Sequence, residues 1–377
     1  MKSIIIAADI VPTKSNYKLF ENGDIDSLIG KELRTKLNNA SFSAMNLEVP
    51  LADKTDPIRK CGPCLISPTN TILGISKINP HFMTLANNHI LDQGYSGLTS
   101  TIDILRKYNI SYAGAGNNIE EAKKPFIISI EGIKFGFYCC TEHEFSVATD
   151  MSPGANPYDP LVSFDDVQAL KSSCDYIIVL YHGGKEHYRY PSPMLRRIFH
   201  KFADVGADLV IAQHTHCIGC KEEYKGCTLV YGQGNFLFDY SDSDFWKTSL
   251  LIQINLDNLQ IEYIPIVKEE NRVRLASNEE AVTILEGFCK RSEEILKDGF
   301  IEERYEKFAS EIKREYYYRF SGGFTKNLIM RGLNKLSSHK MIDRFYKEDS
   351  RIGIQNVLEC EAHRELAITV MKQMNDD

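Results

Sequence analysis

The chain has 377 residues, of which 43% are hydrophobic and 25% are charged, a composition typical of an ordinary globular protein. Its net charge of −7 excludes a broad electrostatic affinity for nucleic acid or anionic membranes, and no stretch approaches the roughly 20 apolar residues that a membrane span needs. The N-terminal segment is interrupted by Asp9 and lacks the pattern of a secretory signal. We therefore expect a cytoplasmic protein with reduced cysteines, no nucleic-acid partner and no membrane span.

Strand and helix patterns alternate along the first two thirds of the chain. Strand patterns occupy residues 3–9, 41–51, 78–89, 125–140, 174–184 and 208–216, and helix patterns occupy residues 24–39, 97–109 and 193–206. Three further strand patterns, at residues 227–239, 249–256 and 259–267, follow without a helix between them. This order predicts an α/β protein with mixed sheets that are covered by helices.

Near residue 270 the strand patterns give way to charged helical patterns, including residues 302–320 and 354–374. We therefore predict a domain of residues 1–268 and a helical C-terminal appendage of residues 269–377. The run from Tyr316 to Phe320 is too apolar for an isolated helix. We expect the appendage to pack on the core or to join two copies of the chain as a homodimer.

Polar side chains follow five of the predicted strands, at the point where each strand ends. They are Asp9, Glu48, Asn87, Asn88, His89, His182, His214 and His216. Ligands of α/β sheets gather outside the carboxyl ends of the strands, and this set of oxygen and nitrogen donors suits a divalent transition metal such as Mn, Fe or Zn. The pattern favours a site for one or two ions over polar loops that are merely solvated.

The sequence HTH, His214 to His216, follows the predicted strand Asp208–Ala212. In an extended segment, residues two apart share a face, so the two imidazoles are expected to converge on one point. A second pattern, Cys61-Gly62-Pro63-Cys64, has the C-x-x-C spacing of redox and zinc sites, but Pro68 follows where a redox helix would run. We interpret these two cysteines as small, partly apolar residues rather than as a redox or zinc site.

Six motifs fall in order at residues 1–265: NLEVP, LANNHILDQG, YAGAGNNIEEA, YHGGKEHY, GADLVIAQHTH and YGQGNFLFD. Together they resemble the poly-γ-glutamate capsule-biosynthesis (CapA-type) family, which is similar to the calcineurin-like metallophosphoesterases. The resemblance implies a four-layer αββα sandwich of two mixed sheets, with metal ions at one edge. It does not extend to the helical appendage.

The resemblance implies six metal ligands: Asp9, Glu48, Asn88, His182, His214 and His216. Glu48 would bridge two ions. His89 would be a catalytic residue that does not bind metal and that assists the phosphate or protonates the leaving group, with Asp92 orienting it. Val11 stands where the phosphoesterase pattern has a histidine, which leaves the first metal position with Asp9, Glu48 and His216. Glu186 matches an acidic family position that would contact substrate or hold His182, or it is a surface residue.

The predicted function is that of a metal-dependent hydrolase, a phosphomonoesterase or phosphodiesterase. Its expected substrate is a phosphorylated glycan or polymer precursor of a cell-surface polysaccharide or capsule. One alternative is a poly-γ-glutamate biosynthesis factor that acts on an amide-linked polymer, and another is a scaffold that metal stabilises without catalysis. The chain has no G-x-x-x-x-G-K-[ST] loop, which argues against a ligase that uses ATP on its own.

Overall fold

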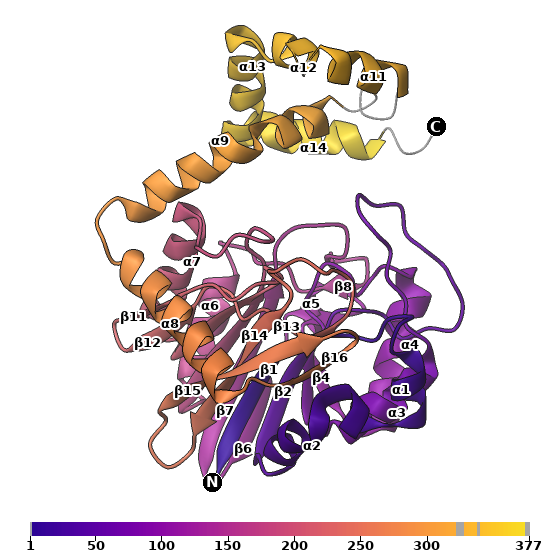
Figure 1. Cartoon of the computed structure of the whole chain (residues 1–377), viewed down its shortest axis with the longest axis vertical. Coiled ribbons are helices and arrows are strands. Elements are labelled where there is room, and N and C mark those ends of the chain that lie inside the picture. Colours follow the sequence, from indigo (N-terminus) through magenta and orange to yellow (C-terminus); the bar gives the residue numbers. More distant parts are fainter. Residues whose placement is uncertain (1, 322–327, 338–339, 374–377) are drawn as a thin grey trace. The chain divides into compact units, whose positions relative to one another are not determined.

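A computed structural model describes residues 2–321, 328–337 and 340–373. The chain forms two compact units, Met1–Ile301 and Glu302–Asp377. In the described residues, all strands belong to the first unit, and the second unit is helical (Figure 1). No helix in the described part of the chain combines the length and the apolar content that crossing a membrane requires.

An eight-stranded mixed sheet contains the N-terminal strand. Its strands are β1 (Ser3–Val11), β2 (Phe42–Leu47), β3 (Phe82–Thr84), β4 (Ser111–Ala113), β13 (Asn235–Phe238), β14 (Thr248–Asn255), β15 (Ile261–Glu269) and β16 (Arg272–Leu275). They follow the order β16-β15-β14-β1-β2-β3-β4, and β13 also pairs with β1. Strands β1 to β4 are parallel, whereas β14, β15 and β16 pair antiparallel.

A six-stranded sheet forms the second layer of strands. Its strands are β6 (Phe126–Ile130), β7 (Ile133–Thr141), β9 (Tyr176–His182), β10 (Leu209–Gln213), β11 (Lys221–Tyr224) and β12 (Cys227–Val230). The order is β11-β12-β10-β9-β7-β6. Strands β6 and β7 form a hairpin that turns at Glu131 and Gly132, where both residues have positive φ. A separate pair consists of β5 (Ala115–Gly116) and β8 (Gly154–Ala155).

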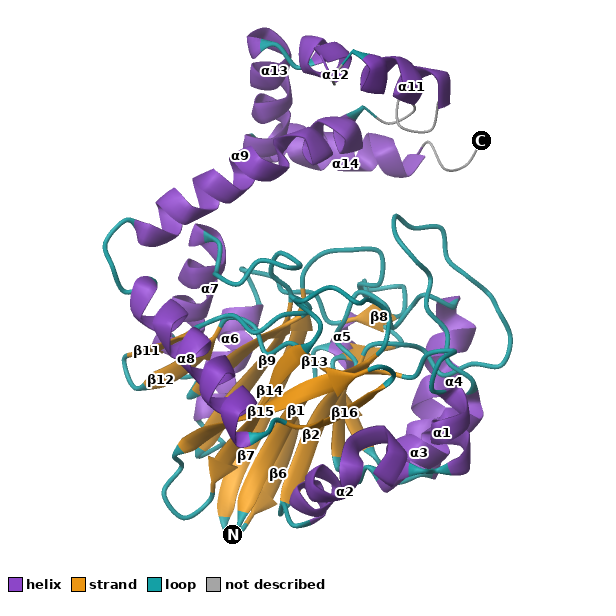
Figure 2. Cartoon of the chain, viewed as in Figure 1, coloured by secondary structure: helices purple, strands orange, loops and turns teal. Residues whose placement is uncertain are grey.

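Helices cover the outer faces of both sheets (Figure 2). Those of the first unit are α1 (Tyr17–Asn22), α2 (Ile25–Asn38), the short 3-10 helix η1 (Thr69–Thr71), α3 (Ile72–Lys77), α4 (Gly94–Lys107), α5 (Ile119–Ala122), α6 (Ser163–Lys171), α7 (Pro193–Asp204) and α8 (Asn278–Glu294). Their ends follow local sequence signals. Helix α7, for example, begins with Ser192, whose hydroxyl accepts a hydrogen bond from Leu195 N, and has Pro193 at its first position.

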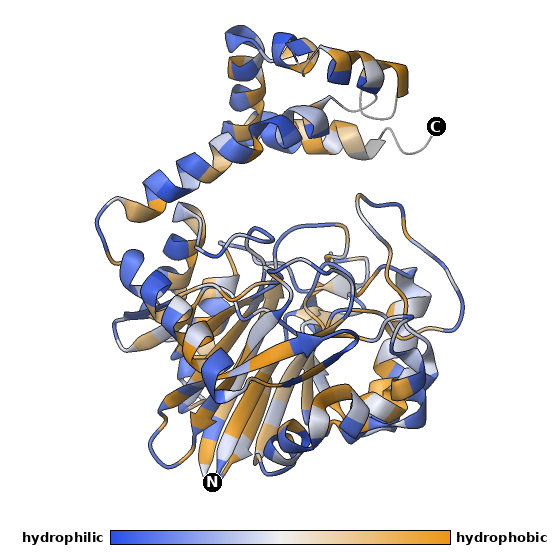
Figure 3. Ribbon diagram, viewed as in Figure 1, coloured by the Kyte–Doolittle hydropathy of each residue, from blue (hydrophilic) through white to orange (hydrophobic). Residues whose placement is uncertain are grey.

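Alternate burial along the strands builds the four layers. Ile4 and Ile6 of β1 lie in the apolar cluster between the two sheets, whereas Ile5 and Ala7 lie in the cluster beneath α1 to α4. In the second sheet β9 alternates in the same way between the inner cluster and a third cluster beneath α6 and α7. Apolar residues accordingly run along the strands in Figure 3. The predicted αββα sandwich with a helical C-terminal region is confirmed.

The first unit extends past the predicted boundary at residue 268. Strand β15 continues to Glu269, and β16 pairs with it across a two-residue turn in which Glu270 has a φ of 51°. Helix α8 begins with a capping box between Ser277 and Glu280, and its Phe288 packs on Tyr263 of β15. Residues 269–301, which the sequence assigns to the appendage, therefore belong to the first unit.

The second unit contains most of α9 (Phe300–Phe320), with α11 (Leu328–Leu336), α12 (Lys340–Phe345), α13 (Glu348–Glu359) and α14 (Glu361–Gln373). Within it, Tyr317 stacks on Tyr346 with ring centroids 4.4 Å apart. The single helix that we predict at residues 354–374 is wrong, because Cys360 adopts an extended backbone that separates α13 from α14. The packing of the appendage on the core or on a second copy stays a prediction.

Truncation after residue 301 is expected to leave a cooperatively folding first unit, whereas truncation after residue 270 is expected to destabilise it. The shorter chain loses the buried side chains of Phe288 and Ile295, each of which contributes about 1.5–3 kcal/mol by burial. Thermal unfolding of the two truncated proteins, followed by circular dichroism, tests this difference. Equal melting temperatures would contradict the assignment of α8 to the first unit.

Candidate metal centre

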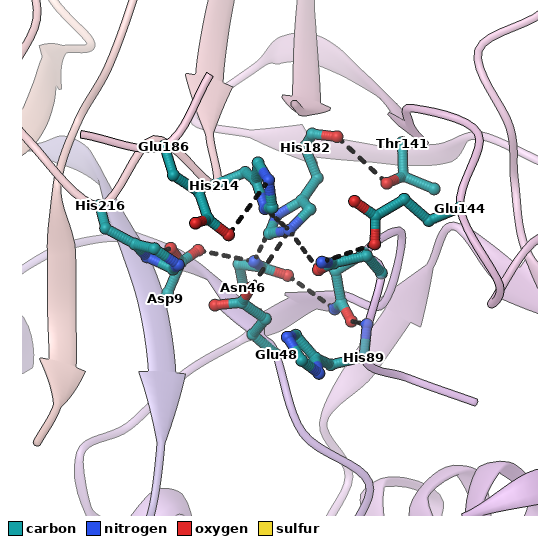
Figure 4. A network of polar contacts seen from close by, with 12 residues as sticks. Asp9, Asn46, Glu48, His89, Thr141, Glu144, His182, Glu186, His214 and His216 are labelled. Atoms are coloured by element: carbon teal, nitrogen blue, oxygen red, sulfur yellow. Dashed lines mark hydrogen bonds and ion pairs between the residues drawn. The ribbon is translucent and has the colours of Figure 1, made fainter. Parts of the chain in front are cut away.

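The carboxyl ends of the parallel strands bring most of the predicted site residues together at one edge of the sandwich (Figure 4). In the described residues, three groups of side chains have potential ligand atoms within 4.8 Å of one another, and two of these groups share Glu48: Glu48 with His182 and His214, and Asp9 with Glu48 and His216. All five side chains are buried. Because Glu48 belongs to both groups, its carboxylate lies between two potential cation positions.

Three carboxylate oxygens at this site lack hydrogen-bond donors. Asp9 Oδ2 and both carboxylate oxygens of Glu48 are buried and accept no hydrogen bond. The nearest cationic candidate for Glu48 is His182, whose Nε2 lies 3.2 Å from Glu48 Oε1. Since a buried carboxylate oxygen without a hydrogen-bond donor is unfavourable, the arrangement fits a bound cation. The buried His, Glu and Asp groups therefore suggest a divalent-metal site.

Asn88 presents its amide oxygen to the same edge. Its Nδ2 donates to Glu144 Oε2 at 3.1 Å, which fixes the orientation of the amide. Its Oδ1 then lies 3.0 Å from His182 Nε2, beside Glu48. Glu144 thus acts on Asn88 as an outer-shell partner acts on a metal ligand. Sequence patterns alone do not single out Glu144, because it follows β7 outside the motifs.

The two histidines of the HTH sequence do not lie in an extended segment. Strand β10 ends at Gln213, and His214 and His216 have φ values of 87° and 53°. Positive φ is uncommon for residues other than glycine and is often found at functional sites. The turn places His214 with His182 and His216 with Asp9, so the rings serve two adjacent groups. The extended segment that we expected is therefore wrong, but the two imidazoles still approach one another, because ligand atoms of both lie within 4.8 Å of each other in a third group with Glu186.

The surroundings shift the pKa values of the two imidazoles in opposite directions. Burial lowers the pKa of His214 well below its usual value, and the neighbouring His182 and His216 lower it further. Burial also lowers the pKa of His216, but the Asp9 carboxylate, whose Oδ2 lies 3.7 Å from His216 Nδ1, and the charge of Glu48 outweigh burial and raise it to about 9. Only neutral imidazole binds a metal. His214 is therefore in its binding form at neutral pH, whereas His216 must release a proton.

Two asparagines that were not predicted as site residues hold these groups in place. Asn46 Nδ2 donates to Asp9 Oδ1 at 2.6 Å and lies 3.1 Å from His182 Nδ1. Asn235 pairs with Asp9 across β1 and β13, and its Oδ1 lies 2.8 Å from His216 Nδ1. Asn46 belongs to the motif NLEVP and Asn235 to the motif YGQGNFLFD. The motifs could therefore have pointed to both residues, but their contacts depend on strand register.

His89 and Asp92 form a separate pair beside the two groups. His89 Nδ1 lies 2.6 Å from Asp92 Oδ2, and the His89 side chain is 12% exposed, whereas Asp92 is fully buried. Neither residue belongs to a group of potential metal ligands in the described chain. The pair thus has the geometry of an imidazole that a carboxylate orients.

Lys60 contacts both members of this pair and was not predicted as a site residue. Its side chain is 2% exposed, and its Nζ lies 2.5 Å from Asp92 Oδ1 and 3.2 Å from His89 Nδ1. The Nζ also donates to Asn88 O at 3.1 Å. Lys60 lies in a loop without periodicity, which is why no pattern pointed to it.

Val11 leaves the first metal position without an imidazole from β1, and Glu186 places a carboxylate near the HTH turn. Val11 is buried in the apolar cluster beneath α1 to α4, so β1 supplies no imidazole. Glu186 Oε1 lies 3.9 Å from His214 Nε2 and forms a third group with His214 and His216. Glu186 is thus placed at the rim of the site beside the HTH turn, rather than holding His182.

Comparison with known sequences places this site in a family. The sequence model of the family described as "Bacterial capsule synthesis protein PGA_cap" matches residues 3–240. PGA biosynthesis protein CapA of Bacillus subtilis (strain 168) is 29% identical over 189 residues, 48% of this chain and 48% of the relative. Capsule biosynthesis protein CapA of Bacillus anthracis is 27% identical over 232 residues, 58% and 56% respectively. The chain thus spans about half the length of these relatives.

Several solved structures are similar to the chain at low sequence identity. A phosphatase from Mycoplasma pneumoniae has a TM-score of 0.45 at 14% identity, over 71% of this chain and 94% of that chain. A putative 5'-nucleotidase from Staphylococcus aureus has a TM-score of 0.41 at 14% identity, over 77% of this chain and 58% of that chain.

The family match spans the region that builds the site. It begins at the start of β1 and ends after β13, and so includes the strands and loops that carry Asp9, Glu48, His182 and the HTH turn. Because it covers more than half of the chain, this protein belongs to the bacterial capsule synthesis protein family PGA_cap.

Proposed function

We propose that this protein is a metal-dependent hydrolase, a phosphomonoesterase or phosphodiesterase, that acts on a cell-surface polysaccharide or capsule precursor. The observation that supports it best is the set of three buried oxygens of Asp9 and Glu48 that accept no hydrogen bond and lie among imidazoles. A site for divalent cations beside an oriented histidine is what hydrolysis of a phosphoester requires.

Two metal positions are proposed, with Glu48 shared between them. Asp9, Glu48 and His216 would hold one ion, and Glu48, Asn88, His182 and His214 would hold the other. All donors are oxygen or nitrogen, which suits Mn, Fe or Zn. Bound divalent ions would polarise a phosphoryl oxygen and lower the pKa of water.

The remaining groups of the chain supply orientation and protons. Asp92 accepts the Nδ1–H of His89, which leaves Nε2 to deliver a proton to the leaving oxygen. Lys60 holds the other oxygen of Asp92 and thereby keeps the carboxylate in place. Asn46 and Asn235 fix Asp9 and His216 in the same way.

The family supports a second candidate function. The relatives are named for biosynthesis of capsule and of PGA, so the same centre would act on an amide-linked polymer such as poly-γ-glutamate. A third candidate is a scaffold that the metal stabilises without catalysis. The three candidates share the same site residues and differ in whether the site acts on a phosphoester, on an amide or on no substrate.

Metal content and substrate screening separate the three. Protein purified without chelators and loaded with Mn²⁺ is assayed on p-nitrophenyl phosphate, bis(p-nitrophenyl) phosphate and poly-γ-glutamate. Glu48→Gln, which keeps the shape of the side chain, is expected to lose metal and to lower phosphoester turnover by about 10²–10³-fold, as loss of one charge-stabilising group typically does. Glu131→Gln, in an exposed pair with Lys2, is the matched control.

The outcomes point in different directions. Phosphoester turnover that falls in Glu48→Gln but not in Glu131→Gln supports the hydrolase. Shortening of poly-γ-glutamate without phosphoester turnover would favour the polymer factor, and bound metal without any turnover would favour the scaffold. Protein that binds no Mn, Fe or Zn at all would contradict the metal centre itself.

A further inference from the structure

The Cys61–Cys64 turn is fastened to Asp92 from both sides. Lys60, directly before it, places Nζ 2.5 Å from Asp92 Oδ1, and Leu65, directly after it, donates its backbone N–H to Asp92 Oδ2 at 2.6 Å. The backbone N–H of Ile58 also donates to Asp92 O at 3.1 Å. The conformation of these four residues and the position of the carboxylate that orients His89 are therefore coupled.

The two thiols of this turn differ from the other cysteines in access. Cys61 is exposed, Cys64 is partly buried, and both are free. A second pair with the same spacing, Cys217 and Cys220, follows the HTH turn and is completely buried. Burial raises the pKa of Cys217 to about 11. The second pair therefore offers the same spacing without solvent access and serves as an internal control.

The turn is also held by one of its thiols. Cys64 Sγ donates to Ile58 O at 3.3 Å, and Gly62 has a φ of 92°, a conformation that a side chain would disfavour. Burial raises the pKa of Cys64, and the Asp92 carboxylate raises it further. The exposed Cys61 thiol is thus the one that a soluble oxidant reaches first.

The access of Cys61 and the contacts of the turn with Asp92 argue against the interpretation of these cysteines from the sequence, and we propose that Cys61 and Cys64 form a thiol–disulfide site whose closure releases Asp92 from Lys60. The oxidant is a peroxide. The Cys61 thiol attacks the O–O bond and becomes a sulfenic acid as one water leaves. The Cys64 thiol then attacks the Cys61 sulfur, and the second water leaves as the S–S bond forms. Two thiols and one hydrogen peroxide thus give one disulfide and two waters.

Closure disturbs the turn in two ways. The disulfide removes the S–H that Cys64 donates to Ile58 O. The new S–S bond is also expected to change the conformation of the turn next to Lys60 and Leu65. Lys60 Nζ is then expected to leave the carboxylate and reach solvent. This exposure does not depend on the proposed function, whereas its effect on turnover through Asp92 and His89 rests on that function.

The test uses the full chain in the reduced and the peroxide-treated state. Intact mass and peptide mapping report the disulfide, and a short pulse of N-acetoxysuccinimide followed by peptide mapping reports the reactivity of Lys60. Reduced protein is expected to have ten free thiols and a protected Lys60. Oxidised protein is expected to carry a Cys61–Cys64 disulfide and to acetylate Lys60 at least about tenfold faster, as local opening of a buried group predicts. Dithiothreitol should reverse both changes.

The controls isolate the turn from general oxidation. The double variant Cys61→Ser/Cys64→Ser should keep Lys60 protected under peroxide, and Cys217 and Cys220 should stay reduced in the wild type. Persistence of the Cys61 and Cys64 thiols, or a disulfide without faster acetylation of Lys60, would overturn the inference. Failure of the proposed function looks different, because reduced, metal-loaded protein would then show no phosphoester turnover while the disulfide and the labelling still appear.

Discussion

His89→Ala is expected to lower phosphoester turnover by about 10²–10⁴-fold, the size typical of losing a general acid or base, while bound metal stays unchanged. His89 contacts Asp92 and Lys60 and belongs to no group of potential metal ligands in the described residues. Its removal therefore takes away a proton donor and leaves every donor atom of the metal positions intact.

His214→Ala is expected to lose both metal and turnover, because this imidazole lies in the group with Glu48 and His182. Asp92→Asn should fall between the two in turnover, since it orients His89 without transferring a proton. Metal content by mass spectrometry and turnover at one Mn²⁺ concentration give the comparison, with the exposed His363→Ala as control. Equal metal loss in the His89 and His214 variants would identify His89 as a ligand.

Lys60→Met is expected to lower the free energy of unfolding by about 3–5 kcal/mol, the usual effect of removing one partner from a buried ion pair. The Lys60 and Asp92 side chains are 2% and 0% exposed, so no water replaces the lost ammonium. Asp92→Asn in the Lys60→Met background should recover part of this loss, because the amide carries no charge.

Urea unfolding of the variants measures this effect, and Lys2→Met provides the matched control. Lys2 pairs with Glu131 at a similar distance, 2.6 Å, but both side chains are exposed, so its loss should change stability little. If Lys60→Met and Lys2→Met shifted the unfolding midpoint equally, the buried Lys60–Asp92 pair would contribute no more to stability than the exposed Lys2–Glu131 pair.

Periodicity was sufficient to predict mixed sheets covered by helices and most of the residues at the site, whereas the four-layer arrangement was implied by the resemblance to the CapA-type family. Alternation along β1 sends Ile4 and Ile5 to opposite faces of the first sheet. Parallel strands also end at one edge, so the polar residues that follow them meet there. Their positions at strand ends were sufficient to predict Asp9, Glu48, His182, His214 and His216 as site residues. The resemblance to the family implied the role of each.

What escaped prediction depends on contacts between distant segments. Lys60 reaches Asp92 across 32 positions of the chain, from a loop that has no pattern of its own. The positive φ of His214 and His216 comes from the turn that packs around them, not from a local propensity for it. Strand β16 was missed because Arg272 and Arg274 mask its short alternation, which only pairing with β15 makes clear.

A divalent ion held by Asp9 and Glu48 would also tie the stability of the fold to the supply of metal. A ligand that binds the folded but not the unfolded chain adds RT ln(1 + [L]/Kd) to stability, about 2.7 kcal/mol when the free ligand is at 100 times Kd. Without metal, the folded chain keeps both carboxylates buried, with the imidazoles of His182 and His216 as their neighbouring basic groups in the described residues. Metal starvation would thus enlarge the unfolded population that proteases degrade, and the amount of this protein would follow metal availability even where its synthesis does not.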